Sequence, residues 1–270
     1  MPWKLICTPG VNFGQSPTAP PALDAATLAW ISIVQLVGAT PTDGRQQLVN
    51  SLIVGLKDDG VWNKLNTLWL LANESFATAN IDVVGTDSWS AVNSPSFQVD
   101  RGYTFDGSSN FLSLISLGAA TINSESIYAY ARTTSGVNNA CYLGLSDANG
   151  ASVIFDATGG TAKMQVNDNT LSSAGSFVAG LLVATRTASN ARALYNNSSG
   201  NPIVSDSTAS VGVPAVTLYL GARDNNHTAD SFCGFQCAAA GYGQALNSTD
   251  VANLSKRINT YLTALGANVY

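Results

Sequence analysis

The stretch SIYAYAR, residues 126–132, carries the most information about the fold. Its small apolar residues alternate with tyrosines, and successive side chains of a β-strand point to opposite faces of the sheet. Ile127, Ala129 and Ala131 therefore share one face, and the two tyrosines share the other. We expect both faces to be partly covered by other parts of the protein, as in a sandwich of two layers.

Short runs of β-forming residues continue on both sides of this strand, roughly ten residues apart from Ser94 onward. Clusters of Gly, Asn, Asp and Ser separate them, and these residues tolerate the positive φ angles of hairpin turns. This spacing predicts a mainly β protein whose residues 94–270 form one antiparallel β-sandwich. The runs are 97–99, 111–114, 126–132, 141–145, 152–155, 163–166, 181–185, 192–195, 217–220 and 232–240.

The chain closes with the clearest helix pattern in the sequence. The cluster NSTD at residues 247–250 is a typical N-cap, apolar residues follow at helical spacing as far as Leu265, and Gly266 ends the pattern. The apolar stripe of this helix must pack against another element. We expect it on the N-terminal helices or on one edge of the sandwich.

Two helices are also expected before the sandwich. The first is predicted from Asp24 to Gly38, with Asp as its cap and Gly at its end. The second follows Asp43, which has the spacing of a capping box with Gln46, and it ends at Asp59. Together they predict a helical hairpin.

The regions flanking this hairpin complete the predicted organisation. Residues 8–24 hold four of the nine prolines, so residues 1–24 are expected to form an extended arm or linker. Residues 25–93 would then be a helical attachment region that leads into the first strand. Periodicity leaves open whether residues 62–71 are that strand or a short buried helix.

The composition excludes several classes of partner. Only 11% of the 270 residues are charged, against a typical share of about 25%, and the formal net charge is −5. No basic cluster is present to neutralise phosphates, so we expect no binding to nucleic acid or to anionic membranes. No apolar run reaches the roughly 18 residues that span a bilayer, and the N-terminus lacks the apolar stretch of a signal peptide. A soluble protein is expected.

Catalytic residues are scarce. Jelly-roll glucanases of the retaining type place two glutamates and an aspartate on one strand, with two carboxyl groups about 5 Å apart. The only glutamates of this sequence, Glu74 and Glu125, lie far apart in the chain and outside any such pattern. There is no Gly-x-Ser-x-Gly motif, and His227 is the only histidine, so a zinc site would need unusual ligands. We therefore expect a protein that is not an enzyme and that has no cofactor.

The cysteines are expected to be buried thiols. Cys233 and Cys237 would lie about 13 Å apart if both were on one strand, too far for a disulfide. Free cysteine is among the most buried residue types, so we expect the same of Cys7 and Cys141.

One polar loop is the main candidate for ligand binding. It follows a strong strand and contains Asp224, Asn225, Asn226, His227 and Asp230. Asn and Asp side chains hold sugars through planar hydrogen bonds, and Ca²⁺ takes carboxylate and carbonyl oxygens, so either a glycan or Ca²⁺ could bind. The alternative is an exposed hairpin without a ligand.

Other loops offer the same chemistry more weakly. The candidates there are Asn138, Asn139, Asp147 and Asn149. Trp89 is flanked by serines, so we expect this tryptophan to be exposed, where its ring could serve as a platform for sugar stacking.

The second half of the chain resembles a known fold family. The segment YTFDGSSNFL, residues 103–112, is similar to the F-D-G-x-x-x-aromatic entry strand of concanavalin A-like, laminin-G-type jelly rolls. The segment SFCGF, residues 231–235, and the cap that begins at Leu246 resemble the usual close of that group. The resemblance covers roughly 94–266 and implies a jelly roll, a fold that serves lectins, glycosidases and structural modules alike.

The first part resembles a narrower group. Residues 38–44, GATPTDG, residues 52–57, LIVGLK, and residues 59–65, DGVWNKL, look like the opening of proteins from phages and prophages of proteobacteria. In those proteins a helical piece precedes a laminin-G-like domain, and they are taken to be tail fibres, spikes or capsid decorations. The resemblance implies a location in the virion, assembled in the cytoplasm of a bacterial host.

Three functional hypotheses follow. The leading one is a virion structural protein whose proline-rich arm or helical hairpin attaches to other virion chains while the jelly roll faces outward. It would also contact copies of itself in a homo-oligomer such as a trimer. The second is a lectin for host surface polysaccharide, which is compatible with the first or can stand without a virion. The third, a polysaccharide-degrading enzyme with an Asp-based site, would require carboxylates that converge in a cleft.

Overall fold

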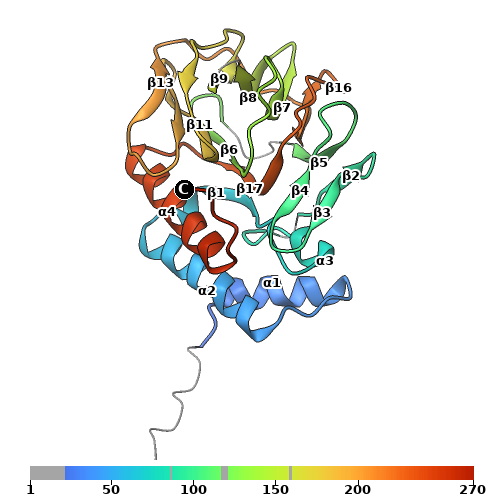
Figure 1. Ribbon diagram of the computed structural model, residues 1–270. Helices are drawn as coiled ribbons and strands as arrows, with labels where there is room; N and C mark the ends of the chain where they lie inside the picture. Colours follow the sequence, from blue (N-terminus) through green and yellow to red (C-terminus); the bar gives the residue numbers. More distant parts are fainter. Residues whose placement is uncertain (1–21, 86, 117–120, 158–159) are drawn as a thin grey trace, which may run out of the picture.

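The computed structural model describes residues 22–270 apart from 86, 117–120 and 158–159. Two β-sheets pack face to face, and helices cover the outer face of one of them (Figure 1). A sandwich with N-terminal helices and a C-terminal helix is thus confirmed. Most of the arm expected at 1–24, and Cys7 with it, lies outside the described residues.

The sheet beneath the helices, here called sheet A, has the strand order β13-β12-β11-β6-β17-β4-β3, and β1 pairs with the second half of β17. All of its pairings are antiparallel. Its strands are β1 (Leu65–Trp69), β3 (Ser96–Gln98), β4 (Gly102–Thr104), β6 (Glu125–Ala131), β11 (Gly180–Ala188), β12 (Ala191–Asn196), β13 (Pro202–Asp206) and β17 (Gln236–Gly243).

The opposite sheet, here called sheet B, has the order β10-β9-β8-β7-β14-β5-β2, and a hairpin of β15 and β16 joins it beside β7. The pairing of β15 with β7 is parallel. Its strands are β2 (Ser90–Val92), β5 (Phe111–Ser116), β7 (Cys141–Asp147), β8 (Gly150–Ala157), β9 (Thr161–Asp168), β10 (Gly175–Ser176), β14 (Thr217–Leu220), β15 (Arg223–Asn225) and β16 (Thr228–Asp230).

The two faces of β6 pack into two different cores, as the alternation of its residues predicts. Its small residues Ile127, Ala129 and Ala131 lie in the core between the sheets, whereas Tyr128 and Tyr130 lie in a second core under the helices. The Tyr128 hydroxyl donates to the backbone carbonyl of Thr67 on β1, so a buried polar group finds a partner. Both faces of β6 are therefore covered.

The helices are α1 (Ala25–Leu36), α2 (Asp43–Asp58), the short α3 (Phe76–Ala79) and α4 (Ser248–Ala264), with a 3₁₀ turn at Trp62–Lys64. Asp24 caps α1 as predicted, accepting from the backbone N–H of Ala26. The cap of α2 is Thr42 rather than Asp43, and Gln46 donates to the Pro41 carbonyl, so the predicted cap is wrong by one residue and the predicted capping box is wrong. Thr42 has the extended backbone that an N-cap needs.

Helix α4 begins at the predicted cap, where Asn247 and Asp250 form a capping box. It packs against α2 and against the outer face of sheet A rather than on a sheet edge. Two ion pairs fix it, Arg257 with Asp59 at 2.7 Å and Lys64 with Asp250 at 2.6 Å.

The segment 62–71, left open by periodicity, begins with the 3₁₀ turn and continues as strand β1 over residues 65–69. Because β1 pairs with β17 and β2 pairs with β5, part of the region 25–93 is hydrogen-bonded into both sheets. The helices of this region share one apolar core with sheet A.

Three further expectations can be compared with the structure. Trp89 is only 4% exposed and donates its indole N–H to the Ala79 carbonyl, so the expectation of an exposed platform is wrong. Cys141, Cys233 and Cys237 are buried and free, as predicted. The last strand begins at Gln236, so 232–235 is not part of it.

Within the described residues, no helix is long and apolar enough to span a membrane.

Candidate ligand-binding sites

The predicted loop is the hairpin of β15 and β16. Its two turn residues, Asn226 and His227, have φ angles of 52° and 68°, as a tight two-residue hairpin turn requires. Asp224 is buried, and its two carboxylate oxygens accept the N–H groups of His227 at 2.7 Å and Thr217 at 3.0 Å. This side chain therefore holds the hairpin in shape.

Asp230 is also engaged within the hairpin. It receives two hydrogen bonds from the Arg223 guanidinium, at 2.8 and 2.6 Å, and one from the Asn225 amide at 3.0 Å. Burial acts to raise the pKa of Asp230, but the bonds from Arg223 outweigh it and lower this pKa. An anionic Asp230 thus has its charge balanced by Arg223.

The turn between β7 and β8 lies beside this hairpin. Asn226 donates its backbone N–H to the Ser146 carbonyl at 2.8 Å, while Asp147 accepts the N–H groups of Asn149 at 2.7 Å and Ala215 at 2.8 Å. The exposed side chains that gather here are those of Asn149, Asn225, Asn226 and His227.

Asn138 and Asn139 do not belong to this group. They precede β7, whose seven residues separate them from Asp147 by about 20 Å, and the N–H of Asn139 donates to the Asp156 carbonyl at 2.8 Å. The predicted residues therefore lie at opposite ends of sheet B, with Asn138 and Asn139 before β7 and the others from its last residue onward. Within the described part of the chain, no three His, Cys, Asp or Glu side chains are arranged to hold a metal ion.

Sequence reasoning did not identify a pocket of about 370 Å³ on strands β11, β12 and β13 of sheet A, here called the edge pocket. Its location explains the failure, since three separate strands supply its lining and no local motif marks them. The lining residues are Thr185, Thr187, Asn190, Ala191, Arg192, Ala193, Tyr195, Pro202, Ser205 and Asp206.

Hydroxyl and amide groups dominate the accessible lining of the edge pocket. Thr187, Asn190 and Ser205 are exposed. Tyr195 is 8% exposed, and its hydroxyl has no hydrogen-bond partner within the described residues. Thr185 is different, because its hydroxyl already donates to the Glu125 carbonyl and accepts the N–H of Leu246. The pocket thus offers several donors and acceptors that are free for a ligand.

A buried ionic network lies behind the edge pocket. The Arg192 guanidinium bridges Asp168, at 2.7 Å, and Asp206, at 2.8 and 2.9 Å, and Arg186 donates to Asp168 at 2.9 Å. The hydrogen bonds from Arg192 lower the pKa of Asp206 to about 2, although burial opposes this. Arginines within otherwise apolar strands are the sequence signal that could have pointed to this region.

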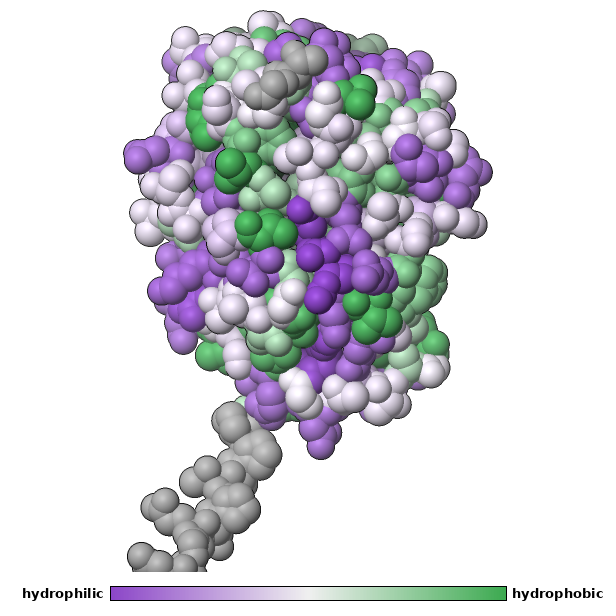
Figure 2. Space-filling model, viewed as in Figure 1, coloured by the Kyte–Doolittle hydropathy of each residue, from purple (hydrophilic) through white to green (hydrophobic). Residues whose placement is uncertain are grey.

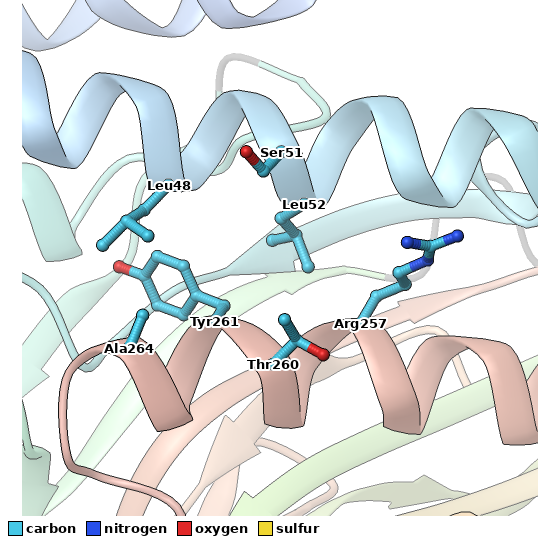
Figure 3. Close-up of a pocket in the computed structure, with 7 residues that line it drawn as sticks. All are labelled: Leu48, Ser51, Leu52, Arg257, Thr260, Tyr261 and Ala264. Carbon is cyan, nitrogen blue, oxygen red and sulfur yellow. The ribbon is translucent and has the colours of Figure 1, made fainter.

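A second, more apolar groove of about 260 Å³ runs between α2 and α4 (Figure 3). Leu48 and Leu52 point into it from α2, and the ring of Tyr261 rises from α4. The Tyr261 hydroxyl accepts from Arg45 and donates to the Ala72 carbonyl, and Arg257 is held by Asp59. The polar side chains of this groove are therefore already hydrogen-bonded within the protein, and Ser51 and Thr260 donate to carbonyls of their own helices.

Comparisons with known proteins bear on the fold. No family model and no curated protein matches the chain. Among solved structures, Trypanosoma rangeli sialidase in complex with sialic acid is similar at 12% identity and a TM-score of 0.51, over 84% of this chain and 40% of the sialidase. The binding domain of botulinum neurotoxin DC in complex with rat synaptotagmin II is similar at 11% identity and a TM-score of 0.55, over 73% and 52% of the two chains.

These likenesses support the sandwich fold alone. The chain spans about two fifths of the length of the sialidase structures that it matches. None of these likenesses bears on the virion location that the first part of the sequence implies.

Proposed function

We propose that this protein is a carbohydrate-binding module without catalytic activity or cofactor, and that the edge pocket is its ligand site. The observation that carries the proposal is a set of hydroxyl and amide groups beside the Tyr195 hydroxyl, none of which has a hydrogen-bond partner among the residues that the structure describes. Sugars present hydroxyl groups that both donate and accept, and an aromatic residue with a polar tip suits such ligands. The sialidase, whose solved complex contains a sugar acid, supports the ligand class by analogy of fold.

The acid groups at the edge pocket do not favour hydrolysis. Most glycosidases need two carboxyl groups on either side of the bond that breaks, and Asp206 is the one acid in the lining. With its pKa lowered to about 2 by Arg192, Asp206 is a poor proton donor. Burial raises the pKa of Tyr195, and this hydroxyl has no basic partner, so a tyrosine nucleophile is not activated either.

We further propose that the module is displayed on a phage virion as a tail fibre, spike or decoration protein. The support is the resemblance of residues 38–65 to phage proteins. In Figure 1, α1 and α2 lie at the end of the molecule opposite β7, β8 and β16. Leu28, Leu36 and Val37 of the α1 segment are exposed apolar residues. Figure 2 shows apolar residues among polar ones on the visible face of this end of the molecule. This end would contact other virion chains or copies of the protein, for example in a trimer.

A glycan array with the full chain tests the first proposal. We compare wild type with Tyr195→Phe, which keeps the ring, and with Asn190→Ala. Each should weaken the binding of the best glycan about 2- to 10-fold, because each removes one hydrogen-bonding group. Asn226→Ala, at the predicted loop, is the matched control and should bind as wild type. Loss of binding in Asn226→Ala alone would instead assign the site to the loop.

A cryo-EM map of the particle that carries this protein tests the virion proposal. Density for the sandwich should be connected to the particle through α1 and α2, with the β15–β16 hairpin directed outward. Absence of the chain from purified particles would refute the virion location and leave the glycan proposal standing.

A further inference from the structure

The charges of the edge pocket limit the kind of sugar that it can hold. Two of its lining residues are charged, Arg192 and Asp206. The side chain of Arg192 is 0% exposed. Its Nε and Nη2 donate to Asp206, and its Nη1 donates to Asp168 and to the Thr170 carbonyl at 2.6 Å. This guanidinium therefore has no free edge for a ligand.

Asp206 differs from Arg192 in its exposure. Its side chain is 31% exposed, and it also accepts the N–H of Thr208 at 3.0 Å. The charged group of the lining that reaches solvent is thus an anion. The exposed residues that surround it, Thr187, Asn190 and Ser205, are uncharged.

A carboxylate on a sugar would meet unfavourable conditions in this pocket. Proteins hold carboxylates with paired guanidinium or ammonium donors, and here the one cation of the lining, Arg192, already donates to Asp168 and Asp206. The ligand carboxylate would lose water without gaining a cation, and it would be repelled by Asp206. Neutral hydroxyl and acetamido groups meet neither obstacle.

We infer that the edge pocket selects uncharged glycans, built from neutral hexoses or N-acetylhexosamines, and rejects glycans whose contacting residue is a uronic or sialic acid. This inference rests on the proposed function, since it specifies the ligand of the same site. It also separates this protein from its structural neighbour, whose solved complex contains sialic acid.

The test is a pair of titrations with the full chain. The neutral glycan that binds best on the array is compared with the same glycan carrying a uronic acid in place of its terminal hexose, at 20 mM and 500 mM NaCl. We expect the neutral glycan to bind at least tenfold more tightly at low salt and the difference to shrink at high salt, because salt screens the repulsion by Asp206.

A second experiment tests for a gain of binding to the uronic acid glycan. Thr187→Lys places a cation at the exposed rim of the pocket without disturbing the Arg192 network, and it should improve binding of the uronate at least fivefold. Thr187→Gln, similar in size but uncharged, is the control and should leave the preference for the neutral glycan unchanged.

The outcomes separate the two proposals. Tighter binding of the uronate by wild type, still weakened by Tyr195→Phe, overturns the inference and keeps the edge pocket as the site. Failure of Thr187→Lys to gain uronate binding also counts against the inference. Binding of no glycan, or binding that no pocket variant alters, overturns the proposed function and the inference with it.

Discussion

Glu125 provides the sharpest test of the energetics of the core. It lies at the start of β6, its side chain faces the space between the sheets, and it is 0% exposed. Within the described residues neither of its carboxylate oxygens has a hydrogen bond of full geometry, although the Ser152 and Asn167 side chains lie near enough to offset part of the cost of burial. Burial raises the pKa of Glu125 from its ordinary 4.5 to about 7, although Ser152, Asn167 and Arg186 act to lower it.

The sign and size of the effect follow from this pKa. The folded state binds the proton more tightly than the unfolded chain, so this stabilisation is complete below pH 4.5 and is lost as the pH rises through 7. A difference of about 2.5 pKa units, at about 1.4 kcal/mol each, corresponds to about 3.5 kcal/mol of unfolding free energy. Glu125→Gln removes the titration and keeps the shape.

Urea unfolding of both proteins at pH 5, 6, 7 and 8 measures the difference. We expect Glu125→Gln to be more stable than wild type by less than about 1 kcal/mol at pH 5 and by up to about 3 kcal/mol at pH 8. Burial also raises the pKa of Asp82 to about 7, which adds a similar slope to both proteins, so the difference between them isolates Glu125. Asp58→Asn, at an exposed position, is the control. A difference that stays constant with pH, or favours wild type at pH 8, would show that Glu125 is charged in the fold and that this reasoning is wrong.

Three other predictions address the helix cap, the hairpin and the groove. Asn247→Ala removes the side-chain half of a capping box, and urea unfolding should show a loss of about 1 kcal/mol; no loss would refute its role in starting α4. Asp224→Ala removes a buried carboxylate that accepts two backbone N–H groups of the hairpin region and should cost about 1–3 kcal/mol, while Ca²⁺ should leave the Tm of wild type unchanged, since a rise in Tm would reveal a metal site at the hairpin. Leu52→Ala, in the wall of the α2–α4 groove, should cost about 2–5 kcal/mol in the same assay, and a smaller loss would mean that α2 and α4 pack loosely.

The features that the sequence predicted are those that neighbouring residues determine. The alternation in β6 follows from the geometry of a single strand, and the caps of α1 and α4 are formed by side chains within three residues of the N–H groups that they bind. By contrast, Trp89 is flanked by serines, and its burial comes from Tyr103 and Ala79, whose approach depends on the tertiary fold. A local pattern could not have indicated it.

The candidate site was hard to predict for a chemical reason. The Asn and Asp side chains that bind sugars are also those that stabilise turns with positive φ, and in Asp224 and Asp147 the second role is the one observed. The edge pocket, on the other hand, depends on register. Thr185 lies opposite Ala193, which lies opposite Ser205, across strands that the sequence separates.

The ionic network behind the edge pocket stabilises that strand register. Arg192 on β12 is held between Asp168 on β9 and Asp206 on β13, so it ties the edge strand of sheet A to the opposite sheet. Buried ion pairs of this kind add little net stability because desolvation offsets the attraction, but a shifted register would leave a buried charge unpaired, which is costly. The network therefore acts against slippage of β13. A pocket whose walls are fixed in advance loses less conformational entropy when a ligand binds, so the network connects the buried core to recognition at the surface.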